Sequence, residues 1–327
     1  MSVLVTGGAG YIGAHVVRLL VERGDGVVVV DDFSSGSRAR VADVPVVEID
    51  LSTEAAVGPL TDVMREHEVG AVIHIAAKKQ VGESAQRPAY YYRQNVGGSA
   101  NLLQAMEEAG VDRLMFSSSA ATYGMPDVAP GAAIDEDVAP RPISPYGETK
   151  LVSEWLHRAA GGAWGLRTVN LRYFNVAGSG WDDLGDPGVH NLIPIVLSQL
   201  TAGEQPVIFG DDYDTPDGTC IRDYVHVLDL AQAHLAALDY LGQDDRPYDV
   251  FNVGTGSGAS VREVLEQVAA STGLDVQPTV APRRPGDPDR LVARVERIRD
   301  VLGWKATHGL AEIVDSAWAA WQRTPAT

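Results

Sequence analysis

Short apolar runs alternate with amphipathic segments through the first half of the chain. The strand candidates are rich in β-branched residues and lie at Val3–Val5, Val27–Val30, Val44–Ile49, Ala71–Ile75, Arg113–Phe116 and Thr168–Leu171. Apolar strands separated by helical segments are typical of a parallel sheet that is covered on both faces. The pattern therefore predicts an α/β fold with a doubly wound parallel sheet of the Rossmann type.

The pattern changes after about Asn175, where loops rich in Gly, Pro and Asp begin. Two examples are AGSGWDDLGDPGVHN and FGDDYDTPDGTC, which are separated by shorter helical segments. We therefore predict a dinucleotide-binding domain over residues 1–176 and a smaller C-terminal substrate-binding lobe over residues 177–327. The helical run near 227–242 is expected to pack back on the first domain.

Charge and cysteine content narrow the choice of partners. The 26 basic and 44 acidic residues give a net charge of −18, which disfavours nucleic acid and anionic membranes as partners. Six arginines between Arg283 and Arg299 form the obvious candidate for binding an anion. The single cysteine, Cys220, cannot form an internal disulfide, and no signal-type segment precedes the first strand, so a soluble cytoplasmic protein is expected.

A glycine-rich turn lies between the first predicted strand and the first helix. In VLVTGGAGYIGAHVV, Gly7 permits a sharp turn, Gly10 lets backbone amides approach a pyrophosphate, and Gly13 allows close packing of helix on strand. Asp31 ends the next strand, within the reach at which a carboxylate accepts hydrogen bonds from the adenosine ribose. This combination predicts a dinucleotide cofactor.

Two further acids refine the cofactor prediction. Asp32 adds negative charge beside Asp31, which repels the 2′-phosphate of NADP and favours NAD. Asp50 follows another strand, where it either meets the adenine edge or forms a turn, and the sequence leaves both options open.

The run SPYGETKLVSEW carries the candidate catalytic pair. Tyr146 and Lys150 are four residues apart, so on a helix they lie on one face, one turn from each other. A cationic Lys150 would favour the phenolate and make Tyr146 a usable general base and acid. In FSSSAATYG, Ser119 follows a strand at the edge of the sheet where such folds bind ligands, so its hydroxyl is a third candidate.

These motifs together resemble those of the extended short-chain dehydrogenase/reductases. Within that group, the runs HIAAKKQVGESAQRP, FSSSAATYG, SPYGETK, LRYFNVAG, IFGDDYDTPDGTCIRDYVHVLDLA and APRRPGDP are similar, in this order, to those of the UDP-glucose 4-epimerase family. The resemblance implies NAD-dependent epimerisation of the 4-hydroxyl of a UDP-hexose through a 4-keto sugar, without net redox change. It also implies a homodimer, with Tyr146 as base and acid, Lys150 as cofactor anchor and Ser119 as hydroxyl contact.

The same resemblance assigns further residues to the two ligands. The cofactor would be contacted by Gly7, Gly10, Tyr11, Ile12, Gly13, Asp31, Asp32, Asp50, Leu51, Ala76, Lys79, Asn95, Ser117, Tyr146, Lys150, Tyr173 and Phe174. The UDP-sugar would be contacted by Ser119, Tyr146, Phe174, Asn175, Asn191, Leu192, Val207, Phe209, Arg222, Arg284 and Asp287. In this assignment Val207 and Phe209 flank uracil, and the two arginines hold the diphosphate.

Several alternatives are weighed against this reading. A sugar-nucleotide dehydratase needs further proton-transfer groups, whereas Ala120 and Ala121 stand at the positions where that family carries Asp and Glu. A non-catalytic NAD-sensing regulator would not need Tyr146 and Lys150, and a net oxidoreductase would release reduced cofactor. The resemblance implies that Leu291 lies in the region that lines the sugar pocket, so UDP-N-acetylglucosamine or a UDP-pentose remains an alternative substrate. No metal-binding motif is found, and none is predicted.

Overall fold

A seven-stranded parallel sheet forms the centre of the larger lobe. The protein is described by a computed structural model over residues 2–129, 131–243, 248–284 and 286–323. The sheet has the order β10-β6-β5-β4-β1-β2-β3. Its strands are β1 (Ser2–Thr6), β2 (Gly26–Asp31), β3 (Val46–Glu48), β4 (Val69–His74), β5 (Arg113–Ser117), β6 (Arg167–Tyr173) and β10 (Tyr248–Val253). The predicted doubly wound sheet is confirmed, and six of its strands fall on the predicted runs.

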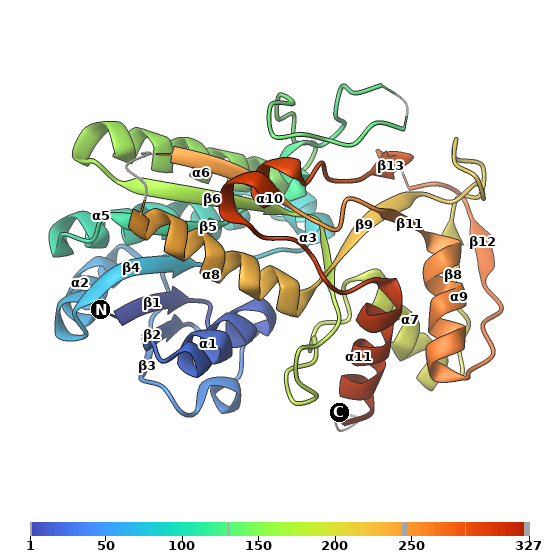
Figure 1. Ribbon diagram of the computed structural model, residues 1–327, viewed down its shortest axis with the longest axis horizontal. Coiled ribbons are helices and arrows are strands. Elements are labelled where there is room, and N and C mark those ends of the chain that lie inside the picture. The colour runs from blue at the N-terminus through green and yellow to red at the C-terminus, as the bar shows by residue number, and fades with distance from the viewer. Residues whose placement is uncertain (1, 130, 244–247, 285, 324–327) are drawn as a thin grey trace.

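Helices cover both faces of this sheet because its central strands are apolar on both sides (Figure 1). One face packs against α1 (Tyr11–Arg23), α8 (Val227–Gln243) and α10 (Glu296–Leu302). The other packs against α2 (Val57–Glu66), α5 (Gly98–Ala109) and α6 (Pro145–Trp164). Each face thus has its own apolar core, and α8 packs on the first lobe as the sequence predicts.

The strand order reverses at β1, which lies between β4 on one side and β2 on the other. Connections leave in opposite directions at such a point, so a crevice opens beyond the carboxyl ends of these strands. The short elements of the first lobe surround this edge. They are η1 (Arg38–Val41), η2 (Glu54–Ala56), α3 (Val81–Gln86), α4 (Pro88–Tyr91), the π-helical η3 (Tyr92–Gly97) and η4 (Ala120–Thr122).

The second lobe, on the right of Figure 1, combines small sheets with three helices. Strand β9 (Ile221–His226) pairs with β7 (Asn175–Ala177), β11 (Gly258–Ser260) and β13 (Arg290–Leu291), and β8 (Val207–Phe209) pairs with β12 (Thr279–Ala281). Helices α7 (Leu192–Thr201), α9 (Val261–Thr272) and α11 (Leu310–Arg323) share one apolar core with them. None of the helices in the described residues is long and apolar enough to span a membrane.

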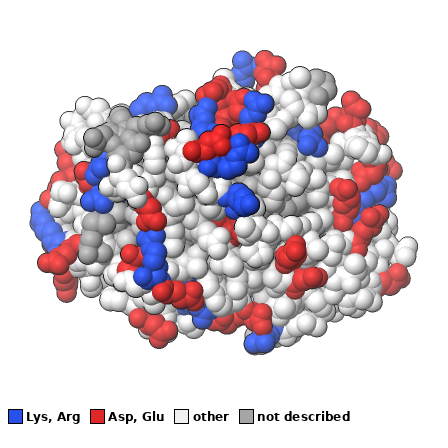
Figure 2. Space-filling view, viewed as in Figure 1, with Lys and Arg blue, Asp and Glu red and all other residues white. Residues whose placement is uncertain are grey.

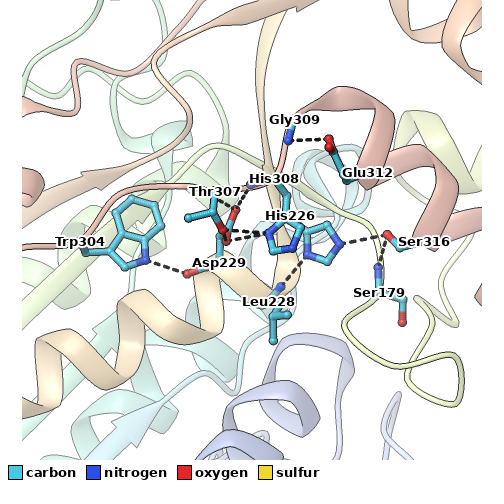
Figure 3. A network of polar contacts seen from close by, with 10 residues as sticks. All are labelled: Ser179, His226, Leu228, Asp229, Trp304, Thr307, His308, Gly309, Glu312 and Ser316. Atoms are coloured by element: carbon cyan, nitrogen blue, oxygen red, sulfur yellow. Dashed lines mark hydrogen bonds and ion pairs between the residues drawn. The ribbon is translucent and has the colours of Figure 1, made fainter.

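A polar network ties the C-terminal segment to the start of α8 (Figure 3). The buried carboxylate of Asp229 accepts hydrogen bonds from Thr307 N at 3.0 Å, Thr307 Oγ1 at 2.8 Å and His308 N at 3.0 Å. Trp304 Nε1 donates to the Asp229 carbonyl at 3.0 Å. On the other side, Ser316 Oγ contacts His226 Nε2 at 3.0 Å. The segment between α10 and α11 is therefore fixed to the first lobe.

The structure adds one sheet strand to those predicted. Strand β10 pairs in parallel with β6 over six residues, although it lies far beyond the predicted boundary at residue 176. Its sequence, YDVFNV, mixes polar and apolar residues because it is an edge strand with one neighbour, so it does not show the continuous apolar run of the other strands. Whether residues 1–176 act as a separate domain stays a prediction.

Several of the arginines between Arg283 and Arg299 form ion pairs with acidic residues. Arg294 pairs with Asp135 at 3.3 Å and Arg297 with Asp137 at 2.8 Å. Figure 2 likewise shows basic and acidic side chains mixed in one patch near its top centre. Arg283 pairs with Asp212 at 2.6 Å. Neighbouring carboxylates therefore neutralise these three arginines, and anion binding by the rest of the stretch stays a prediction.

Candidate active site

The glycine-rich turn leaves open space in front of the N-terminus of α1. Gly7 has a φ of 69°, and a Cβ added there would lie 2.7 Å from Ala76 N. A Cβ on Gly13 would collide with the Gly7 carbonyl. Gly10 is the N-cap of α1 and no side chain caps this end. The first amides of α1 are thus free to bind an anion such as a diphosphate.

The carboxylate of Asp31 is held in place at the end of β2. It accepts hydrogen bonds from Ala9 N at 2.9 Å and from Phe33 N at 2.8 Å. Burial raises the pKa of this carboxyl group, and the two backbone hydrogen bonds oppose that rise. Its position beside the glycine turn is the one in which a carboxylate accepts hydrogen bonds from a ribose hydroxyl.

Asp32 has a partner that the sequence analysis did not assign. Lys78 Nζ lies 3.4 Å from Asp32 Oδ2 and also contacts the hydroxyl of Ser34. Burial acts against ionisation, yet the hydrogen bonds from Ser34 and the charge of Lys78 lower the pKa of Asp32. Because Lys78 follows β4 and Asp32 follows β2, this ion pair links the two strands that flank β1. In the sequence, the only feature that could have pointed to Lys78 is its position next to Lys79, which is a predicted cofactor residue.

A single cavity contains most of the predicted cofactor residues. Its lining includes Gly7, Gly10, Tyr11, Ile12, Gly13, Asp31, Asp32, Asp50, Leu51, Ala76, Lys79, Tyr146, Lys150 and Tyr173. Lys78, Ser34 and Gln94 line it as well, and the sequence analysis did not assign them. The cavity therefore combines an anion-binding turn, a ribose-binding acid and the candidate catalytic pair, which fits a dinucleotide.

Three predicted cofactor residues do not line this cavity. Asn95 is buried behind it, where its Oδ1 accepts from Lys78 N at 2.9 Å and its Nδ2 donates to Thr149 Oγ1 at 3.0 Å. Ser117 ends β5 and is buried, and Phe174 packs in a small apolar cluster with Tyr123. Their predicted contacts with the cofactor stay predictions.

Tyr146 and Lys150 lie one turn apart near the start of α6. The helix begins there because Ser144 caps it, with Ser144 Oγ accepting from Gly147 N at 3.2 Å, and Pro145 follows as its first residue. The two side chains are buried, with exposed fractions of 7% for Tyr146 and 2% for Lys150. The structure thus places the pair on one helix, as predicted.

Burial shifts both groups toward their neutral forms. It raises the pKa of Tyr146, while the Ser119 hydroxyl opposes that rise. Burial lowers the pKa of Lys150 to about 7, against the opposing charge of Glu154. Lys150 Nζ donates to the Ser117 carbonyl at 2.7 Å and lies 4.8 Å from the centre of the Phe116 ring. A phenol and an amine with shifted pKa values in one cavity can exchange protons with a bound ligand.

Ser119 caps η4, and its Oγ accepts from Ala121 N at 3.1 Å. Ala120 and Ala121 occupy this same turn, so the described residues of the turn offer no carboxylate beside Tyr146. His74 and His226, both buried, contact Thr6 and Ser316 instead of forming part of a ligand set. No group of three His, Cys, Asp or Glu side chains within the described ranges is placed to hold a metal ion.

A second group of predicted residues gathers in the smaller lobe. Arg222 Nη2 donates to Asp287 Oδ1 at 2.8 Å, and Asp287 N donates to the Arg284 carbonyl at 3.3 Å. The Arg284 guanidinium lies 4.0 Å from the centre of the Phe209 ring. Arg222, Asp287, Arg284 and Phe209 are thus linked in sequence by one ion pair, one backbone hydrogen bond and one cation–π contact. An aromatic ring near two arginines suits a base and a diphosphate.

Other predicted substrate residues lie in separate elements. Val207 shares β8 with Phe209, Asn191 is the N-cap of α7 with Leu192 as its first residue, and Asn175 begins β7. The side chain of Asn191 makes no capping hydrogen bond, so its amide is available to a ligand. The structure leaves their contacts with a substrate untested.

Known proteins match this chain over nearly its full length. The model of the NAD dependent epimerase/dehydratase family matches residues 3–254. A UDP-glucose 4-epimerase of Azospirillum brasilense is 46% identical over 327 residues, which cover 98% of this chain and 92% of that protein.

Solved structures give the same result. UDP-glucose 4-epimerase from Brucella ovis in complex with NAD superposes with a TM-score of 0.91 at 42% identity, covering 97% of both chains. UDP-glucose-4-epimerase from Stenotrophomonas maltophila, with bound NAD and formylated UDP-arabinopyranose, gives a TM-score of 0.92 at 38% identity, covering 99% of this chain and 98% of that one. The similarity includes both lobes.

Proposed function

Because the chain belongs to the NAD dependent epimerase/dehydratase family, we propose that it is an isomerase that inverts carbon 4 of a UDP-hexose. The substrates are UDP-glucose and UDP-galactose, and NAD is the cofactor. The observation that carries the proposal is the cavity in which Tyr146 and Lys150 face the glycine turn and Asp31. A dinucleotide and the group that moves a proton would then meet in one place.

Each catalytic side chain has one task in the proposed reaction. When bound, NAD supplies a reversible acceptor for the hydride of carbon 4. Tyr146 removes the proton of the 4-hydroxyl and returns it after the 4-keto sugar has presented its other face. Lys150, when protonated, favours the phenolate of Tyr146 by its charge, and Ser119 holds the sugar oxygen through its hydroxyl. No net oxidation occurs.

In this proposal the smaller lobe binds the nucleotide part of the substrate. We propose that Arg222 and Arg284 grip the diphosphate, that Phe209 and Val207 cover the uracil, and that Asp287 holds a ribose hydroxyl. Support comes from the contacts that link Arg222, Asp287, Arg284 and Phe209. A dehydratase is disfavoured because the turn that carries Ser119 has alanines beside it, and alanine cannot transfer a proton.

We further propose that the protein is a cytoplasmic homodimer. Trp155 is 57% exposed on α6, and Glu148, two turns earlier on the same face, accepts a hydrogen bond from the exposed Tyr92 at 3.0 Å. An exposed indole on a helix face is the kind of surface that partners cover. Light scattering should give twice the mass of the 34.8-kDa chain, and Trp155→Glu should lower it to that of a monomer. An unchanged mass in the variant would contradict the role of this surface in dimer formation.

The cytoplasmic assignment rests on the single Cys220 and is checked by cell fractionation.

The reaction is tested with purified protein, UDP-galactose and no added cofactor. NMR identifies the sugar while absorbance follows any NADH that is released, and Tyr146→Phe serves as the matched control. Conversion to UDP-glucose without NADH accumulation is the expected result. Stoichiometric NADH would instead indicate a net oxidoreductase, and turnover of only UDP-N-acetylglucosamine or a UDP-pentose would change the substrate. Inertness toward all of them would refute the proposal.

A further inference from the structure

A buried histidine contacts the serine whose carbonyl accepts the hydrogen bond from Lys150. His234 lies on α8 with no exposed surface, and its Nε2 is 2.8 Å from the hydroxyl oxygen of Ser117, 117 positions away in the chain. Its other ring nitrogen, Nδ1, is 2.8 Å from the carbonyl oxygen of Leu230 on the preceding turn of α8. Both nitrogens therefore have one fixed neighbour each.

These two contacts determine the protonation of the ring. A carbonyl oxygen can only accept, so Nδ1 carries the proton and donates it to Leu230. Burial lowers the pKa of His234 to about 4, against the opposing Leu230 hydrogen bond, so near neutral pH the ring has no second proton. Nε2 must then accept, and the Ser117 hydroxyl donates its only proton to it.

Ser117 is in turn the residue that receives Lys150. It is the last residue of β5, and its carbonyl accepts from Lys150 Nζ at 2.7 Å. The nearby carboxylate of Glu154 is already held by Arg172, with Nε–Oε1 and Nη2–Oε2 distances of 2.9 and 2.6 Å. Among the described hydrogen bonds, Lys150 thus has the Ser117 carbonyl as its acceptor. A rotation of this peptide would move the acceptor away from the ammonium.

We propose that His234 is a positioning residue for the epimerase reaction: it anchors the Ser117 hydroxyl so that the Ser117 carbonyl stays directed at Lys150. This inference rests on the proposed function for its meaning in catalysis. The side chain and the carbonyl group belong to the same residue, Ser117. A hydrogen bond that holds the side chain therefore restricts the backbone rotation that would move the carbonyl away from Lys150. His234 does not touch the cavity, whereas Lys150 lines it. Among the described hydrogen bonds, the one with Ser117 is the route by which His234 can affect the reaction.

The test compares four variants in the holoenzyme. His234→Leu removes the acceptor, His234→Gln can present its amide oxygen near the position of Nε2, Ser117→Ala removes the donor, and the fourth variant combines His234→Leu with Ser117→Ala. We expect His234→Leu to lower kcat for UDP-galactose about tenfold, with KM changed by less than about twofold. His234→Gln should stay within about threefold of the wild type, and the double variant should be no slower than Ser117→Ala.

Two results would overturn the inference. One is a double variant whose loss is the product of the two single losses, because His234 would then act independently of Ser117. The other is a His234→Gln variant as slow as His234→Leu. Should His234→Leu fail to fold, Ser117→Ala and His234→Gln carry the test, since normal kcat in Ser117→Ala would equally refute it.

A second readout separates this inference from the proposed function. Lys150 is proposed to anchor the cofactor, so His234→Leu should also carry less NAD after purification, measured as nucleotide released on denaturation. If the wild type contains NAD but turns over no UDP-sugar, the proposed function fails, while a lower NAD content in His234→Leu still supports the positioning role. Equal NAD content together with equal kcat would refute it.

Discussion

Replacing Lys150 with methionine should make the cofactor-free protein more stable, although it removes a residue that we place in the reaction. Burial lowers the pKa of this lysine from 10.5 to about 7. Each pKa unit corresponds to about 1.4 kcal/mol, so burying the charged ammonium lowers stability by up to about 5 kcal/mol at low pH. Methionine has a similar length and removes this unfavourable contribution of the charge. It also loses the hydrogen bond to Ser117, which contributes about 1 kcal/mol. About 4 kcal/mol of the unfavourable contribution remains at pH 7, so a net gain of roughly 3 kcal/mol is expected there.

The sign of the effect gives it a distinct pH dependence. Below pH 7 the lysine is protonated in the folded and the unfolded protein, and the whole unfavourable term is present. Between pH 7 and 10.5 the unfolded protein binds more protons, so the stability of the wild type rises with pH, by about 2 kcal/mol from pH 7 to 9. The advantage of Lys150→Met should shrink by the same amount.

Urea unfolding of nucleotide-free protein at pH 7 and 9 measures both quantities. Lys79→Met is the matched control, because Lys79 lines the same cavity but is exposed. It should leave the free energy of unfolding within about 0.5 kcal/mol of the wild type at both pH values. A Lys150→Met variant that is less stable than the wild type at pH 7, or whose advantage is the same at pH 9, would refute the reasoning.

Three further outcomes are expected. Tyr146→Phe should lower kcat by about 10²–10⁴-fold while purified protein still carries NAD, since only the proton transfer is lost; near-normal turnover would exclude Tyr146 as the base. Lys78→Met should weaken NAD binding about fivefold in calorimetry, because it leaves the charge of Asp32 uncompensated beside an anionic cofactor; unchanged affinity would assign Lys78 no role there. Asp229→Ala should lower the free energy of unfolding in urea by about 3 kcal/mol, because Thr307 and His308 lose their buried acceptor; a loss below about 1 kcal/mol would contradict that role.

The features that could be predicted from the sequence are those that depend on residues close together along the chain. The strands Val3–Val5 and Val27–Val30 are buried on both faces and therefore show as continuous apolar runs. The glycine turn and the pair Tyr146 and Lys150 each lie within one turn or helix, so their spacing carries their geometry. The comparisons with known proteins confirm the family and the fold class, whereas the roles of single site residues stay predictions.

Contacts between distant positions could not be predicted in this way. Lys78 and Asp32 are 46 positions apart, and Ser117 and His234 are 117 apart, so no periodicity links them. Strand β10 has no continuous apolar run that would predict it, because an edge strand needs fewer apolar residues than a central one. The ion pairs of the arginine-rich stretch could not be predicted for the same reason, because the acids that pair with Arg294 and Arg297 come from residues near 135.

The return of the chain to the first lobe restricts how this protein can recombine with its relatives during evolution. Helix α8 and strand β10 complete the apolar face and the edge of the first sheet, although they lie beyond residue 226. A gene crossover near residue 176 would make α8 and β10 of one parent pack on the sheet of another, with mismatched side chains in a close-packed core. A single crossover therefore cannot exchange the smaller lobe between relatives without also exchanging α8 and β10. New sugar specificities in this lineage are expected to arise by substitution within its loops and short strands.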